Sequence, residues 1–161
     1  MRQNKRVPKT EILKMLDSEP GFSVTELSRA LQMPRTTLSY HLKRLVENGQ
    51  IAELDASERE RTYTMDNTEA RLRAKLRVVG SNENSVRVLD YYDHAGGSVD
   101  TLNEVAHELQ LSNPTIAWHV ERLKRLGLLE DRGSRAARRH ALTHDGRLVI
   151  SILHRNQQEP F

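Results

Sequence analysis

Two stretches of the chain repeat one another and decide the fold. Residues 25–45 are TELSRALQMPRTTLSYHLKRL, and residues 103–123 are NEVAHELQLSNPTIAWHVERL. When His41 is aligned with His119, both copies place apolar residues at helical spacing, so both bury the same helix faces. The identical pairs are Glu26/Glu104, Leu31/Leu109, Gln32/Gln110, Thr37/Thr115, His41/His119, Arg44/Arg122, Leu45/Leu123 and Gly49/Gly127. A chain written twice in this way predicts a tandem pair of similar domains.

We expect domain 1 to span residues 1–80 and domain 2 to span residues 81–161, with Gly80–Asn84 as the linker. Each copy predicts the order helix, helix, turn, helix, hairpin, helix. This order is a mainly α fold with small β-hairpins, in the α+β class. The predicted first helices are 9–17 and 84–94, the hairpin strands are 50–55 with 61–65 and 128–132 with 138–142, and the fourth helices are 67–79 and 144–156.

The ends of the central helices carry matching signals in both copies. Ser23 with Glu26, and Thr101 with Glu104, have the spacing of a capping box at the start of the second helix. Ser112 is the expected N-cap of the third helix in copy 2. Glycine at the end of the third helix, as Gly49 and Gly127, supplies the left-handed residue that stops a helix.

Composition excludes several classes of protein. The 161 residues contain no cysteine, which rules out disulfide scaffolds, thiol catalysis and cysteine-based metal sites. No apolar run approaches a membrane span, and the basic N-terminus lacks the apolar region of a secretory signal, so a cytoplasmic protein is expected. No Gly-rich phosphate loop or nucleophile motif occurs, so we do not expect an enzyme.

Charge is distributed unevenly between the copies. Residues 1–80 carry 15 Lys/Arg and 11 Asp/Glu, whereas residues 81–161 carry 10 and 11. A positive first half favours a nucleic-acid partner engaged mainly by copy 1.

Two helices joined by a short turn, with the second able to enter a major groove, follow the helix-turn-helix plan. With the added hairpin, residues 36–51 and 115–129 resemble the recognition helix and first wing strand of the ArsR/MarR-type bacterial and archaeal regulators. Residues 141–148, ALTHDGRL, are similar to the LTxxG step that follows the wing in MarR-like proteins. The resemblance implies sequence-specific binding of double-stranded DNA and control of transcription, without a cofactor.

The third helix of copy 1 carries the candidate DNA-binding face, opposite the apolar stripe of Leu38, Leu42 and Leu45. Its polar residues suit phosphates and base edges, although the same pattern fits an ordinary solvated face. The basic wing of copy 2 is the second candidate surface. The candidate DNA-binding residues are Arg35, Thr36, Ser39, Tyr40, Lys43 and Arg44 on the helix and Arg132, Arg135, Arg138 and Arg139 on the wing.

Copy 2 departs from copy 1 on the third helix. Glu121 stands in place of Lys43 and would repel phosphate, and Trp118 stands in place of Tyr40. One hypothesis is that copy 2 grips the DNA backbone with its wing. The other is that Trp118 packs on another domain or subunit and copy 2 binds no DNA. In both, Trp118 is expected to be shielded from water.

The last helix predicts a homodimer interface of Leu148, Val149, Ile152 and Leu153, unless this stripe packs within its own domain. We expect no metal site, because His144, Asp145, His154 and Glu159 do not have a ligand spacing that matches a known site. The alternative function is a protein-interaction scaffold of paired winged helices, like the chromosome-segregation proteins that bind kleisin subunits. The modest net charge of +3 and Glu121 favour this alternative.

Overall fold

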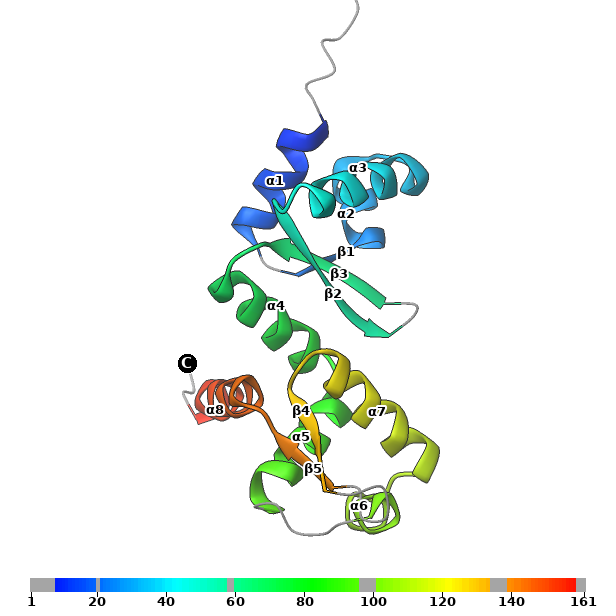
Figure 1. Cartoon of the computed structure of the whole chain (residues 1–161), viewed down its shortest axis with the longest axis vertical. Helices are drawn as coiled ribbons and strands as arrows, with labels where there is room; N and C mark the ends of the chain where they lie inside the picture. Colours follow the sequence, from blue (N-terminus) through cyan, green and yellow to red (C-terminus); the bar gives the residue numbers. More distant parts are fainter. Residues whose placement is uncertain (1–7, 20, 58–59, 96–100, 134–138, 159–161) are drawn as a thin grey trace, which may run out of the picture. The chain divides into compact units, whose positions relative to one another are not determined.

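The structure is a computed structural model that describes residues 8–19, 21–57, 60–95, 101–133 and 139–158 (Figure 1). The chain divides into two compact units, Met1–Arg77 and Val78–Phe161. Within the described residues both units are mainly helical with small antiparallel sheets, as the sequence predicts. No described helix is long and apolar enough to cross a membrane.

The first unit carries its helices around a small sheet in which the strands are ordered β1-β3-β2. The short strand β1, which the sequence did not predict, pairs Phe22 with Tyr63 of β3. The other predicted elements are present, with ends shifted by one or two residues. The elements are α1 (Pro8–Ser18), β1 (Phe22–Ser23), α2 (Val24–Leu31), α3 (Arg35–Glu47), β2 (Ile51–Ser57), β3 (Glu60–Met65) and α4 (Thr68–Gly80).

The core of the first unit is built where α1, α2 and α3 meet the sheet. The apolar stripe of α3 lies at its centre, since Leu38 and Leu42 are completely buried. Burial of a leucine side chain contributes about 1.5–3 kcal/mol. The buried cluster consists of Ile12, Leu16, Leu27, Leu38, Leu42, Leu45, Ile51 and Tyr63.

The second unit follows the same order of three helices, hairpin and helix among its described residues. Its strands form a two-stranded antiparallel sheet in which Leu129 faces Leu142. The apolar face of α8 contributes Val149 and Ile150 to the core. The elements are α5 (Glu83–Ala95), α6 (Leu102–Leu109), α7 (Asn113–Arg125), β4 (Leu129–Arg132), β5 (Arg139–Leu142) and α8 (His144–Gln158).

Helix ends follow the sequence signals in most places. The full capping box forms at Thr101 and Glu104, whereas at Ser23 only the serine oxygen caps, accepting from the Glu26 N–H at 3.2 Å. The Glu26 carboxylate instead accepts from Arg77 at 3.3 Å. Gly49 and Gly127 have the predicted left-handed backbone, with φ of 70° and 73°.

The turn of each helix-turn-helix has a feature that the sequence did not reveal. Gln32 and Gln110 end α2 and α6 in the left-handed conformation, with φ of 51° and 54°. Their backbone N–H groups donate to carbonyls in the last turn of the helix, which closes both turns in the same way. An identical Gln pair in the two copies thus marks the same backbone conformation.

The predicted linker is wrong in detail. Gly80 is the last residue of α4, and α5 begins at Glu83, so most of the expected linker is helical. The division between the compact units falls at Arg77, within α4. Asn82 ends the short connection, and its side-chain oxygen accepts from the Ser85 N–H at the start of α5. A capping asparagine therefore starts a new helix where the composition predicted a loop.

The LTxxG step is a compact joint between β5, α8 and the end of α7. The Thr143 hydroxyl donates to the Gly127 carbonyl at 2.6 Å and accepts from the Gly146 N–H at 3.1 Å. The Thr143 N–H donates to the Leu128 carbonyl at 3.0 Å. A Cβ added at Gly146 would lie 2.2 Å from that same carbonyl oxygen. Only glycine fits at this position.

Candidate nucleic-acid interface

The surface of α3 in the first unit gathers the predicted helix residues on one exposed face. Pro34, in an extended conformation, precedes the first turn, and the buried leucine stripe fixes how the helix is rotated. The six predicted residues, Arg35, Thr36, Ser39, Tyr40, Lys43 and Arg44, are all exposed. The face offers three cations and three hydroxyl groups, and the exposed Glu47 adds one negative charge at the end of the helix.

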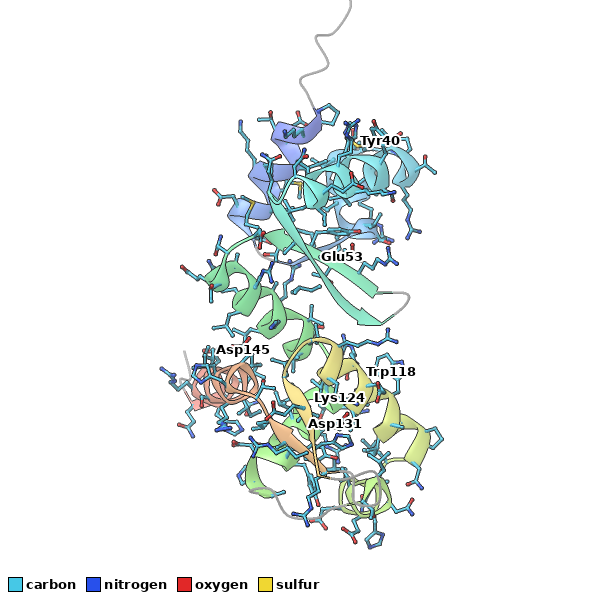
Figure 2. The ribbon with its side chains drawn as sticks, viewed as in Figure 1. Tyr40, Glu53, Trp118, Lys124, Asp131 and Asp145 are labelled. Carbon is cyan, nitrogen blue, oxygen red and sulfur yellow. The ribbon has the colours of Figure 1, made fainter. Side chains whose placement is uncertain are left out.

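Tyr40 and Arg44 form a pair on this face, one helical turn apart (Figure 2). The Arg44 guanidinium donates to the Tyr40 hydroxyl at 2.7 Å and lies 5.6 Å from the ring centre. This hydrogen bond raises the pKa of Arg44. Tyr40 is 56% exposed, so the pair presents a cation and a hydroxyl to a ligand.

The β2–β3 hairpin of the first unit is balanced in charge near its described base. Arg61 forms an ion pair with Glu53 at 3.3 Å. Next to it, Tyr63 is buried, and burial together with Glu53 raises its pKa. This hairpin therefore offers less net positive charge than α3.

The equivalent face of α7 in the second unit is different. Trp118, like Tyr40, has an arginine four residues later, and the Arg122 guanidinium lies 5.4 Å from the ring centre. Arg122, however, is only 5% exposed, so it belongs to the interior. The Trp118 side chain is 45% exposed, so its own unit shields it only in part (Figure 2). Its cover by another domain or subunit stays a prediction.

A buried polar network explains why Arg122 lies in the interior of the second unit. Its guanidinium donates to the Ser85 hydroxyl at 2.8 Å, and Ser85 lies 2.9 Å from His119 Nδ1. Ser85 and His119 share one hydrogen bond, whose direction depends on the tautomer of His119. Burial, and secondly the charge of Arg122, lower the pKa of His119.

We expect acid to destabilise the second unit through His119. Folding lowers the pKa of this imidazole, whereas the unfolded chain takes up a proton near the ordinary value of 6.5. The unfolded state therefore binds more protons in acid, and stability is lost as the pH falls below about 6.5. Urea unfolding followed by far-UV circular dichroism, from about pH 8 to about pH 5.5, measures this loss. His119→Asn, which keeps a hydrogen-bonding amide beside Ser85, should show a shallower pH dependence than the exposed control His107→Asn; equal slopes would contradict this role of His119.

Lys124 of α7 is also engaged within its own unit. Its ammonium group lies 3.0 Å from the Asp131 carboxylate on β4 and 3.3 Å from Glu121, and these partners raise its pKa (Figure 2). Asp131 in turn lies 3.0 Å from His140 Nδ1. The positive charge of Lys124 is thus neutralised by two carboxylates and is little available for phosphate.

The described part of the second wing holds two of its four predicted arginines. Arg132 donates twice to Glu130, at 3.1 and 3.0 Å, and remains exposed. Arg139 is exposed at the start of β5. Arg135 and Arg138 lie outside the described residues.

The predicted dimer stripe on α8 is only partly on the surface. Val149 is completely buried within the second unit, so it belongs to the core and is not available to a partner. Leu148, Ile152 and Leu153 are half-buried. The Leu153 side chain also approaches Gly80, with a methyl carbon 3.3 Å from the position a Cβ would take there. Val149 therefore does not belong to the predicted interface, and the role of the other three residues stays a prediction.

Comparison with known proteins places a helix-turn-helix in the first unit. Residues 11–53 match the family model described as a helix-turn-helix domain. This match confirms the predicted motif, since it spans α1, α2, α3 and the start of β2. No curated protein matches the chain.

Several solved structures are similar at low identity. The MepR–DNA complex of Staphylococcus aureus is 21% identical, with 55% of this chain and 68% of that chain covered and a TM-score of 0.43. A MarR family protein from Bacillus stearothermophilus is 18% identical, with 78% and 77% covered and a TM-score of 0.44. The mRNA-binding domain of elongation factor SelB from E. coli, in complex with SECIS RNA, is 12% identical, with 83% and 95% covered and a TM-score of 0.38.

Proposed function

We propose that this chain is a sequence-specific, double-stranded DNA-binding transcription regulator built from two winged helix-turn-helix domains. The observation that carries the proposal is the exposed face of α3, where all six predicted polar residues stand opposite a buried leucine stripe. The helix-turn-helix match over residues 11–53 supports it independently. The proposed activity is binding without catalysis.

In this proposal α3 lies in the major groove. The N-terminal residues of a recognition helix contact base edges, which assigns that role to Arg35, Thr36 and Ser39. Arginine pairs best with guanine, and the hydroxyl groups suit several bases. Lys43 and the Tyr40–Arg44 pair, further along the helix, are placed to bind phosphates on the groove wall.

A fluorescence polarisation titration with labelled duplexes tests the proposal. We expect binding whose affinity falls with rising salt, because phosphate neutralisation releases counterions. Selection from a random duplex library should enrich one sequence, and the enriched duplex should bind at least about a thousandfold more tightly than mixed sequence. Affinity independent of salt, or no enrichment, would contradict the proposed function.

The second unit has a different role in this proposal, in which its wing binds the backbone and α7 stays out of the groove. Support comes from α7 itself, where Arg122 and Lys124 are held by Ser85, Asp131 and Glu121. The scaffold function remains the second candidate for this unit, because an exposed Trp118 next to Glu121 suits a protein surface better than phosphate.

We expect the double variant Arg132→Ala/Arg139→Ala to weaken binding by a similar factor for selected and mixed duplexes. Wing arginines that touch phosphate add charge attraction but little discrimination, and each lost contact lowers the slope of log affinity against log salt by about 1. Polarisation titrations at several salt concentrations measure both quantities. An unchanged slope would show that the described part of this wing lies off the DNA.

We also propose a homodimer through α8, formed by the half-buried Leu148, Ile152 and Leu153. Leu148→Glu/Ile152→Glu should convert a dimer to a monomer, because two charges would be buried at each side of the interface. Light scattering at tens of micromolar measures the mass, and Gln157→Glu, at an exposed position of the same helix, is the matched control. A monomeric parent protein would refute the dimer.

A further inference from the structure

We propose that Asp90, His94 and His154 form a binding site in the second unit for a first-row divalent transition metal, with Asp93 as a further ligand. The site lies between α5 and α8 and is separate from the residues proposed to bind DNA. The inference therefore does not rest on the proposed function.

The C-terminal half of α5 supplies three of the donors. Asp90, Asp93 and His94 follow helical spacing of three and four residues, which places them on one face of the helix. Their donor atoms all lie within 4.8 Å of one another. The neighbouring Leu89 and Tyr92 are buried and fix the rotation of the helix, so that Asp90 faces α8.

His154 of α8 brings a second imidazole to the same carboxylate. Its Nε2 lies 2.7 Å from Asp90 Oδ1, and His94 Nδ1 lies 3.4 Å from that oxygen. Donors around a tetrahedral zinc ion are about 3.3 Å apart, given metal–ligand distances of about 2.0–2.1 Å. The spacing from His94 Nδ1 to Asp90 Oδ1 matches this value, but the same nitrogen also lies 2.9 Å from the Asp90 backbone carbonyl and would give up that hydrogen bond to bind a metal ion. The contact from His154 would need to open by about half an ångström.

The donor set selects the class of ion. Two imidazole nitrogens with one or two carboxylates suit zinc, nickel or copper, whereas magnesium and calcium take oxygen ligands. Among the described residues, Asp90 Oδ1 is buried without a hydrogen bond, although His154 Nε2 lies 2.7 Å away; a metal ion bound to both atoms would satisfy this oxygen. Asp90 and His94 also line an open hollow, which gives an ion access from solvent.

The residues weighed from the sequence alone do not form this site. His144 and His154 are both on α8, but ten residues of helix separate them by about 15 Å along the axis, too far to share one ion. Only His154 belongs to the cluster, and its partners lie on α5, 60 to 64 positions earlier in the chain. His144 is therefore a matched control on the same helix.

Titration of the tag-free, full-length protein with Zn²⁺ in a calorimeter tests the proposal, with Co²⁺ absorption as a spectroscopic probe. We expect one ion per chain. His94→Ala and His154→Ala should each lower the affinity at least about tenfold, whereas His144→Ala should leave it unchanged. Zinc should also raise the melting temperature of the parent protein, and this rise should shrink in the two variants.

Two results would overturn the site. Absence of stoichiometric binding would do so, and so would normal affinity in both His94→Ala and His154→Ala. If His154→Ala lowers the melting temperature of the metal-free protein yet zinc has no effect on either protein, then His154 and Asp90 form only an ion pair. Circular dichroism of each metal-free variant establishes that it is folded before the titration.

Discussion

Replacing Gly146 by alanine is expected to destabilise the second unit by at least about 2 kcal/mol, even though the change adds one methyl group. The new Cβ would lie 2.2 Å from the Leu128 carbonyl oxygen, well inside van der Waals contact. The Leu128 carbonyl cannot move away without losing a hydrogen bond, because it already accepts from the Thr143 N–H at 3.0 Å. Either α8 moves away from the end of α7, or this hydrogen bond is lost.

Urea unfolding followed by Trp118 fluorescence measures the effect, since the only tryptophan of the chain lies in the second unit. The matched control is Gly80→Ala, at the end of α4. Its Cβ would meet only the tip of Leu153 at 3.3 Å, a flexible side chain that can yield. We expect this control to stay within about 0.5 kcal/mol of the parent. Equal midpoints for the two variants would show that the joint at Gly146 tolerates a side chain.

The order of elements was predictable because its signals are local. Capping residues, the glycines after the third helices and the apolar periods lie within a few positions of the structure they specify, and the repeat displays each signal twice. The strand β1 was missed because two residues are too few to show the alternation of apolar and polar side chains that indicates a strand. It exists only through pairing with β3, as Phe22 opposite Tyr63. The left-handed Gln32 and Gln110 were missed because glutamine does not signal that conformation.

The candidate sites also differ in whether local sequence signals predict them. The face of α3 follows from its buried stripe, and its exposed residues were named from helical geometry alone. The burial of Arg122 was not predictable, because Ser85, its hydrogen-bond acceptor, lies 37 positions away. Likewise, Val149 shares one apolar stripe with Leu148 and Ile152, and only the packed unit shows which member turns inward.

These contacts make the third helices of the two copies chemically different, although their sequences follow a common pattern. The aligned pair Arg44 and Arg122 is identical in sequence, yet Arg44 is exposed beside Tyr40, whereas Arg122 is buried. In the second copy the guanidinium donates to Ser85, which forms a buried polar pair with His119. A residue identity between repeats therefore does not carry a shared function, and the DNA-binding role is best tested on the first copy.

Lys43→Glu is expected to weaken DNA binding at least about tenfold at moderate salt, the largest effect we predict for a single residue of α3. Lys43 is exposed, and among the described side chains it has no ion-pair partner, so its charge is available for phosphate. The substitution removes one attraction and adds one repulsion next to Arg44. Because phosphate contacts carry no sequence information, selected and mixed duplexes should lose affinity by similar factors.

Lys14→Glu on α1 is the matched control, since it makes the same change in net charge at another exposed position of the first unit. An effect of net charge alone would weaken both variants equally, whereas a contact made by α3 weakens only Lys43→Glu. Salt titration also distinguishes a lost contact from an effect of net charge, because losing a phosphate contact lowers the slope of log affinity against log salt by about 1. A Lys43→Glu protein with parental affinity and slope would remove α3 from the interface and leave the scaffold function as the better account of its exposed face.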